Sequence, residues 1–128
     1  MQRKPFERLR QRAEFLAVGK GARSNTDCIG VQARRRGDDD VAPRFGITIT
    51  KKTAPRAVDR NRMRRRLREA LRLGGALSAA DGHDYVIVGR TPILTIPFDA
   101  LRAALGETIV AATRRSQRRT DRKTMQGG

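Results

Sequence analysis

The sequence predicts a small α+β protein, a two-layer sandwich in which a central β-sheet is packed with helices. The chain has 128 residues, which suits one domain with a single modest core. Some segments alternate apolar and polar residues as half-buried strands do, and others carry apolar residues at helical spacing. These segments follow one another as helix, strands, helix, strand and helix, an αβββαβα-like order.

The chain begins with a polar and basic segment, residues 1–8, which we expect to be flexible. Apolar residues then recur at helical spacing, among them Ala13 and Leu16, and predict a short helix from about Leu9 to Val18. The stretch GKGARSN contains two glycines and ends this helix.

Two segments then predict β-strands. Residues 28–35 alternate weakly, whereas residues 44–52 alternate cleanly, with Ile47 on the apolar face and Thr48 on a polar face. Three aspartates at 38–40 lie between the two strands. Consecutive residues of an extended chain point to opposite faces, so we interpret these aspartates as a solvated turn and not as a metal site.

Three further elements complete the expected domain, which covers residues 9–113. An arginine-rich helix over residues 57–73 is ended by two glycines. Residues 83–90 are apolar on both faces, which predicts a central strand. An apolar stripe predicts a last helix over about residues 97–113. Residues 114–128 are basic and almost free of apolar residues, and we expect a disordered tail.

The charge of the chain indicates its class of partner. Lys and Arg number 29 against 13 Asp and Glu, for a net charge of +16. This excess favours binding to a polyanion, nucleic acid above all. No apolar run approaches the ~18 residues of a membrane span, and the start of the chain lacks the apolar stretch of a signal peptide. Cys28 is the only cysteine, which excludes an internal disulfide and suits a cytoplasmic location.

The segment RNRMRRRLREALR, residues 60–72, places seven arginines on a predicted helix. Like charges four positions apart, such as Arg64 and Arg68, cost an isolated helix roughly 1–2 kcal/mol in total. Burial of Met63 and Leu67, at ~1.5–3 kcal/mol each, outweighs this cost. A solvated basic face is the alternative interpretation, but such faces usually mix both signs of charge. Arginine pairs with phosphate through two hydrogen bonds and stacks on bases, which suits RNA.

The stretch GITITKKTAPRAVDRNRMRRRLREAL resembles the signature of the bacterial ribonuclease P protein component. The resemblance extends over roughly residues 9–112, because AEFLAVGKG resembles the first helix of that family and HDYVIVGR the strand after its arginine helix. The matching residues of the signature are Gly46, Thr48, Thr50, Lys51, Lys52, Ala57, Val58, Arg60, Asn61, Arg62, Arg64, Arg65, Arg68 and Glu69.

The resemblance implies an α+β fold with a left-handed βαβ crossover around the arginine helix, a rare exception to the usual handedness. It also implies a function. The protein would bind the catalytic RNA of ribonuclease P and assist removal of the 5′ leader from precursor tRNA. The RNA would carry the chemistry with Mg²⁺, and the protein would hold no metal and no catalytic side chain.

The same resemblance implies roles for individual residues. Contacts with the catalytic RNA are implied for Lys51, Lys52, Arg60, Asn61, Arg62 and Arg65. Contacts with the leader are implied for Phe15, Gln32, Thr48, Arg64 and Arg68. Gly19 and Gln32 depart from the family, because many members carry aromatic residues there. We therefore expect one aromatic platform for the leader and a larger share of the grip from polar and cationic side chains.

Other functions are less well supported by the residues. A metal-free ribonuclease usually needs an acid and a base, but His83 is the only histidine, and we interpret it as a turn residue. No P-loop, zinc cluster or nucleophile triad is found in the sequence. A ribosomal protein or RNA chaperone is the alternative function. A DNA-binding protein would usually show a helix-turn-helix or a minor-groove arm, so we expect neither DNA nor a membrane as partner.

Overall fold

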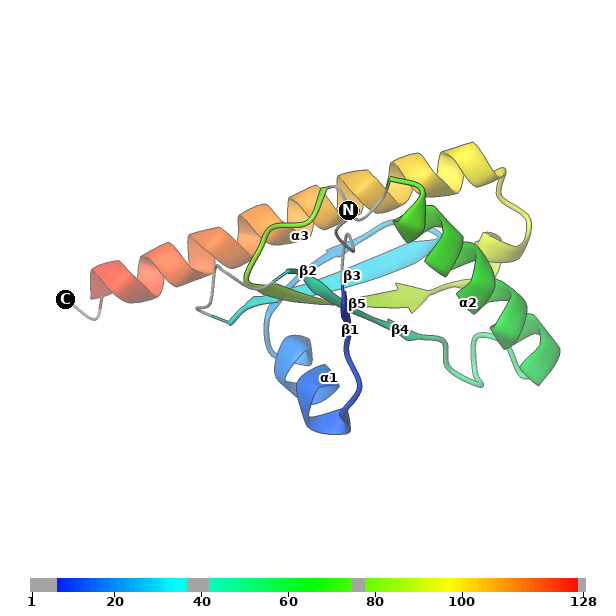
Figure 1. Cartoon of the computed structure of the whole chain (residues 1–128), viewed down its shortest axis with the longest axis horizontal. Coiled ribbons are helices and arrows are strands. Elements are labelled where there is room, and N and C mark those ends of the chain that lie inside the picture. Colours follow the sequence, from blue (N-terminus) through cyan, green and yellow to red (C-terminus); the bar gives the residue numbers. More distant parts are fainter. Residues whose placement is uncertain (1–6, 37–41, 75–77, 127–128) are drawn as a thin grey trace, which may run out of the picture.

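Five strands form one mixed sheet in the order β1-β4-β5-β3-β2 (Figure 1). The computed structural model describes residues 7–36, 42–74 and 78–126. The strands are β1 (Glu7–Arg8), β2 (Ala22–Asn25), β3 (Ile29–Arg35), β4 (Arg44–Thr48) and β5 (His83–Gly89). The helices are α1 (Arg12–Gly19), α2 (Ala57–Arg72), the short 3₁₀ helix η2 (Thr91–Leu94) and α3 (Phe98–Gln126). The predicted α+β class is confirmed.

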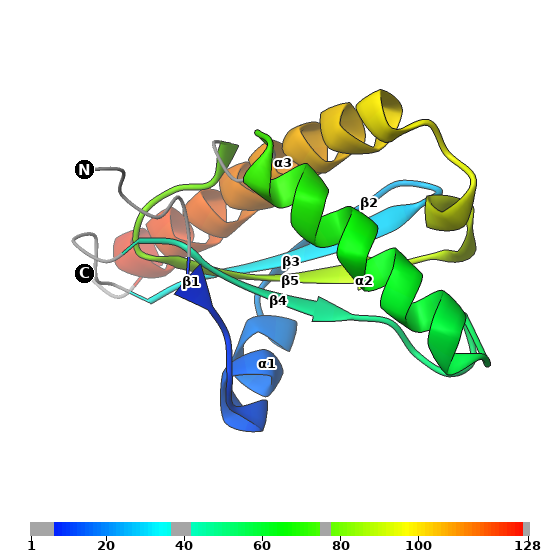
Figure 2. The ribbon, with the colours of Figure 1, turned by 45° about the vertical axis from the view of Figure 1, so that its right-hand side comes forward.

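The helices lie on both faces of the sheet, with α2 and α3 on one face and α1 on the other (Figure 1 and Figure 2). The larger core lies beneath α2 and α3, where Tyr85 and Ile87 of β5 pack among the buried side chains of both helices. The smaller core lies beneath α1 and contains Leu9, Val18 and Val86. Because β5 contributes to both cores, its sequence is apolar on both faces, and its predicted central place in the sheet is confirmed.

The chain from β4 through α2 to β5 forms a crossover between parallel neighbours. This is the expected βαβ unit, and its left-handed sense stays a prediction. The apolar side of α2 is as predicted, because Met63, Leu67, Ala70 and Leu71 are buried. Gly74 follows the helix with a φ of 140°, a conformation that glycine adopts without a steric penalty.

The N-terminal region differs from the sequence prediction. The flexible segment expected over residues 1–8 is wrong for Glu7 and Arg8, which pair in parallel with β4; residues 1–6 lie outside the described residues. The first helix begins at Arg12, and Leu16 is 58% exposed, so it is not a core residue. The glycine-containing stretch after α1 forms the edge strand β2, which the sequence prediction missed. A two-residue and a four-residue strand are too short to show a periodic pattern.

The last helix is longer than predicted. An end near Thr113 followed by a disordered tail is wrong, because α3 continues to Gln126. No proline or glycine interrupts the helix after Gly106, and Ser116 is buried against the rest of the fold. The aspartates at 38–40 lie outside the described residues, so the predicted solvated turn is not placed. Within the described part of the chain, no helix combines the length and the apolar character needed to cross a membrane.

Candidate nucleic-acid interface

The outward side of α2 carries exposed arginines. Arg62, Arg65 and Arg68 are exposed, and each lacks a hydrogen-bond or ion-pair partner within the described ranges 7–36, 42–74 and 78–126. Glu69 pairs with Arg72 at 2.8 Å and not with Arg65. The arginine row is therefore not neutralised by the described residues, and it leaves positive charge directed at solvent.

Two other arginines of α2 support the fold. Arg66 donates hydrogen bonds of 2.6 Å to the carbonyl oxygens of Ile93 and Ile96, and so attaches α2 to the segment around η2. Arg60 donates hydrogen bonds of 2.8 Å to the carbonyl oxygens of Ala54 and Pro55. Arg60 therefore has a structural role beside its predicted contact with RNA, which stays a prediction.

The turn between β4 and α2 presents two lysines. Lys51 and Lys52 are exposed at the end of α2 where the helix begins. The turn is fixed by the hydroxyl of Thr50, which accepts a hydrogen bond from the Thr53 backbone at 3.2 Å. Together with Arg60, this bond holds both lysines close to the first exposed residues of α2. The six residues assigned to the catalytic RNA thus lie on α2 and the turn that precedes it.

A pocket of about 220 Å³ lies between α1, β4 and α2. It brings together three of the residues predicted to meet the leader, namely Phe15, Arg64 and Arg68. Arg8 of β1 also lines it, and the sequence prediction missed this residue because it assigned residues 1–8 to a flexible segment. The pocket is lined by two phenylalanines, Phe15 and Phe45, and by three arginines, which suits a nucleotide that offers a base for stacking and a phosphate for pairing.

Phe15 lies directly over Gly46 of β4. A Cβ atom added at Gly46 would overlap the phenyl ring, so the absence of a side chain at this position leaves the space that the ring occupies. Phe15 is half-buried, and part of the ring remains available to a ligand. Phe15 therefore closes one end of the smaller core and also borders the pocket.

Thr48 and Gln32 lie on the same face of the sheet as Phe15 but do not line the pocket. Gln32 of β3 pairs with Val86, which pairs with Gly46 on its other side, so Gln32 is two strand spacings, roughly 10 Å, from Gly46. Thr48 lies two residues further along β4. Both side chains are half-buried, and both lie on the α1 face of the sheet, outside the pocket.

A network of charged side chains holds α1 against the sheet. Arg44 of β4 donates hydrogen bonds of 2.8 and 2.7 Å to the carboxylate of Asp84 and one of 2.5 Å to Glu14 of α1. Arg36 pairs with the same Asp84 carboxylate. The backbone N–H groups of Gln11 and Arg10, and then Arg44, hold the pKa of Glu14 below its usual value. Sequence patterns gave no signal for this network, because its members are far apart in the chain.

The described residues offer no donor set for a metal ion. They contain no group of three or more His, Cys, Asp or Glu side chains close enough to hold one cation. His83 is buried at the start of β5 and stacks on Tyr85 with ring centroids 5.9 Å apart, so the interpretation of His83 as a turn residue is wrong.

Comparisons with known proteins point to one family. The family model of ribonuclease P matches residues 3–113. The ribonuclease P protein component of Brucella suis is 41% identical over 130 aligned positions, which cover 94% of this chain and 92% of that protein. The corresponding protein of Caulobacter vibrioides is 48% identical over 85 residues, which cover 66% of this chain and 56% of that protein.

Solved structures are similar as well. The RNase P protein from Thermotoga maritima has a TM-score of 0.69 and 27% identity, over 82% of this chain and 96% of that one. The Staphylococcus aureus RNase P protein has a TM-score of 0.65 at 23% identity, which supports the fold. The matched residues include α1, the whole sheet and α2, and therefore every side chain of the candidate interface. The chain belongs to the ribonuclease P protein family.

Proposed function

We propose that this chain is the protein subunit of ribonuclease P, which binds the catalytic RNA and the 5′ leader of precursor tRNA. The observation that carries the proposal is the separation of two cationic surfaces around α2. One surface presents Arg62 and Arg65, which are exposed and have no hydrogen-bond or ion-pair partner among the described residues, and the other contributes Arg64 and Arg68 to a pocket that contains Phe15. A protein with this arrangement can hold one RNA on α2 while it guides a second RNA strand past α1.

The residues of each surface have distinct tasks in this proposal. Arg62 and Arg65, with the lysines of the preceding turn, neutralise phosphates of the catalytic RNA. Arg64 and Arg68 neutralise leader phosphates, and Phe15 stacks on a leader base. Thr48 and Gln32 offer polar groups on the α1 face of the sheet, where the next nucleotides of the leader would pass. These contacts position the precursor, because a leader held at several points loses much of its freedom before cleavage.

The chemistry itself is assigned to the RNA in this proposal. The catalytic RNA binds the Mg²⁺ ions, and they supply an activated water for hydrolysis of the phosphodiester bond. The protein raises the local concentration of positive charge, which lowers the Mg²⁺ concentration that the complex needs. A complex of this kind acts on tRNA precursors in the cytoplasm.

Reconstitution tests the proposal. The chain is mixed with a bacterial ribonuclease P RNA at a Mg²⁺ concentration where the RNA alone is slow, and release of the 5′ leader is followed. We expect cleavage at the mature 5′ end that depends on both components, with the protein alone inactive. Tight binding to both RNAs without any stimulation would contradict the proposal and favour a general RNA-binding protein.

A further inference from the structure

A third cationic surface lies at the β2 edge of the sheet, away from α2. It consists of two adjoining hollows of about 510 and 250 Å³ that share Ala22 and Arg119. We call it the β2–α3 groove. Its exposed cationic side chains include Lys20, Arg23, Arg34, Arg115, Arg118 and Arg119. No acidic side chain lines either hollow among the described residues.

The groove exists because α3 continues past the expected end of the helix. Arg115 donates a hydrogen bond of 2.5 Å to the carbonyl oxygen of Arg23, which attaches α3 to the edge strand β2 (Figure 1). Ser116 is buried on the same side of the helix. Arg118 and Arg119 follow on the exposed part of this turn, and neither has a hydrogen bond or ion pair with any described residue. The described side chains therefore concentrate positive charge here and do not neutralise it.

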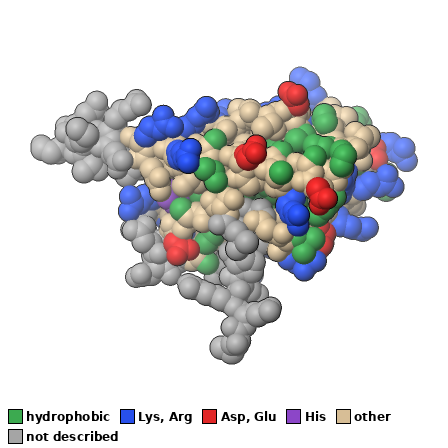
Figure 3. Space-filling model, turned by 90° about the horizontal axis from the view of Figure 1, so that it is seen from above, with side chains coloured by type: hydrophobic (Ala, Val, Ile, Leu, Met, Phe, Trp, Pro, Cys, Tyr) green, Lys and Arg blue, Asp and Glu red, His purple; other side chains and the backbone are tan. Residues whose placement is uncertain are grey.

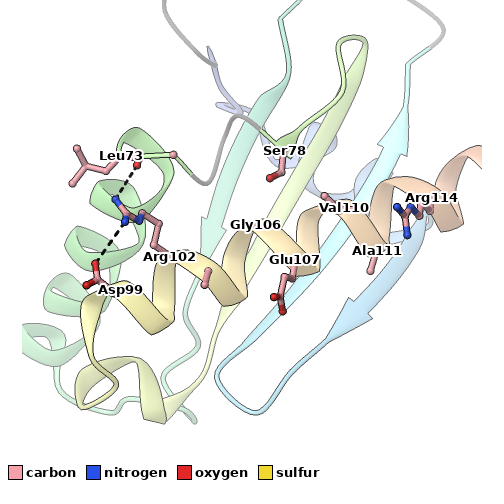
Figure 4. Close-up of a pocket in the computed structure, with 11 residues that line it drawn as sticks. Leu73, Ser78, Asp99, Arg102, Gly106, Glu107, Val110, Ala111 and Arg114 are labelled. Carbon is pink, nitrogen blue, oxygen red and sulfur yellow. Dashed lines mark hydrogen bonds and ion pairs between the residues drawn. The ribbon is translucent and has the colours of Figure 1, made fainter.

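Another hollow on α3, outside the groove, shows that unneutralised positive charge is not a general property of the helix. That hollow, of about 780 Å³, is lined by Arg102 and Arg114 but also by Asp99 and Glu107 (Figure 4). Arg102 pairs with Asp99 at 3.6 Å. In the view onto α3, cationic side chains gather towards both ends, and hydrophobic and acidic side chains lie between them (Figure 3). The β2–α3 groove is thus the part of α3 that is suited to a polyanion.

The chemistry of the groove indicates which form of RNA fits it. Single-stranded RNA is usually bound by aromatic side chains on which its bases stack, and none of the described residues that line the groove is aromatic. Small residues separate the cations, namely Ala17, Gly21, Ala22 and Ala33. Base-paired RNA keeps its bases inside the helix and presents phosphates and 2′-hydroxyl groups. A groove of arginines without stacking platforms suits that surface.

We infer that the β2–α3 groove is a further RNA-binding surface, which takes the phosphate backbone of a base-paired segment of ribonuclease P RNA. The inference rests on the proposed function, because it takes that RNA as the partner. The α3 cations of the groove lie outside the family match, which ends at residue 113. The groove therefore extends RNA recognition to the opposite edge of the sheet from the β1 and β4 side, where Arg64 and Arg68 lie.

The test compares two pairs of substitutions on the same helix of the full-length chain. Arg118→Gln with Arg119→Gln removes two charges from the groove. Arg102→Gln with Arg114→Gln removes two charges from the other hollow and is the matched control. Thermal unfolding confirms that both variants fold, and the Kd for ribonuclease P RNA is then measured over a range of KCl concentrations.

We expect the groove variant to bind the RNA more weakly, with a slope of log K against log salt that is less steep by about 1.4–1.8. The control should keep the wild-type slope. Hydroxyl-radical footprinting should show that the groove variant loses protection along a base-paired segment. These nucleotides should differ from those that Arg62→Gln with Arg65→Gln exposes.

Three other outcomes separate the possible failures. Wild-type affinity and slope for the groove variant, beside a wild-type protein that stimulates cleavage, would overturn the inference and leave the proposed function intact. A loss confined to precursors with long leaders, of about 16 nucleotides against about 4, would overturn it in favour of the leader as occupant. Failure of the wild-type chain to bind or stimulate the RNA would reject the proposed function, and the inference with it.

Discussion

Arg44 and Asp84 are joined by two hydrogen bonds of 2.8 and 2.7 Å across the parallel pair of β4 and β5. The Asp84 side chain is only 3% exposed, and Arg44 extends beyond it to Glu14 of α1. The bond pair therefore links the centre of the sheet to the helix that carries Phe15. Asp84 holds the pKa of Arg44 above its usual value, so the arginine remains charged at any working pH.

Replacing Asp84 with asparagine should destabilise the protein by about 3 kcal/mol, because two guanidinium groups would lose their buried carboxylate. Urea unfolding measures this change. Glu14→Gln is the control, since Glu14 is 22% exposed and its amide replacement can still accept the N–H groups at the start of α1. That control should cost less than about 1 kcal/mol. Equal losses in the free energy of unfolding for the two variants would show that Asp84 contributes no more to the network than Glu14 does.

Gly46→Ala should displace the Phe15 ring and weaken binding of leader-bearing precursor to the reconstituted complex by about tenfold, the worth of one stacked base. The reason is the overlap of the new methyl group with the ring. Binding of mature tRNA should not change. In a Phe15→Ala background the same glycine substitution should have little further effect, because the ring is gone. Additive effects of the two changes would argue against contact between these residues as the cause.

Arg64→Ala with Arg68→Ala should slow cleavage of leader-bearing substrates while the thermal stability stays close to that of the wild type. Both side chains border the pocket, and neither forms a hydrogen bond or ion pair with another element among the described residues. Single-turnover cleavage at a subsaturating concentration of the complex measures the change. Unchanged cleavage by a folded variant would remove both arginines from the leader site.

Loss of Arg66 should affect stability, whereas loss of Arg62 and Arg65 should affect RNA binding. Arg62→Gln with Arg65→Gln should flatten the salt dependence of RNA binding by about 1.4–1.8 and leave the free energy of unfolding almost unchanged. Arg66→Gln should instead lower the free energy of unfolding by about 2 kcal/mol, because its two hydrogen bonds to backbone carbonyl groups are lost. Salt titration and urea unfolding of both variants check this. The opposite pattern would reverse the assignment of structural and RNA-binding arginines.

Tyr85 should make stability fall at high pH. The Thr113 hydroxyl donates to Ile109, so the Tyr85 hydroxyl donates to Thr113 at 2.6 Å. Burial raises the pKa of Tyr85 above 10.0, so its contribution is complete below pH 10.0. This contribution to stability is lost as the pH rises from 10.0 towards the pKa of Tyr85 in the folded protein, because only the unfolded chain releases the proton in that range. The free energy of unfolding then falls by at most about 1.4 kcal/mol per pH unit.

Two measurements check this prediction. Tyr85 is the only tyrosine and there is no tryptophan, so the ultraviolet absorbance of phenolate reports this residue alone. In the folded protein the absorbance should rise above pH 10.0, later than in urea. Tyr85→Phe should remove part of the loss of stability at high pH, and should cost about 1–2 kcal/mol at neutral pH. Titration of the folded phenol at its ordinary pKa would contradict the buried hydrogen bond.

Sequence patterns predicted the elements whose apolar and polar residues form a pattern within one continuous segment. The apolar side of α2 and the central place of β5 follow from patterns within one segment, whereas the strand predicted over residues 44–52 ends at Thr48. The signature around α2 identified the family before any contact was known. The pocket around Phe15 was predicted only in part, because Arg8 reaches it through a strand of two residues.

The sequence by itself determined the class of fold, the basic helix and the family. Only the tertiary structure decided which arginines support the fold, how α1 is held and how far α3 extends. Arg66 and Arg62 look alike in the sequence, yet Arg66 donates hydrogen bonds to carbonyl groups near η2, and Arg62 forms no hydrogen bond or ion pair with the described residues. Periodicity shows which face of an element is apolar, but pairing between distant segments depends on how the whole chain packs. That packing also places Arg118 and Arg119 beside β2 and so forms the groove.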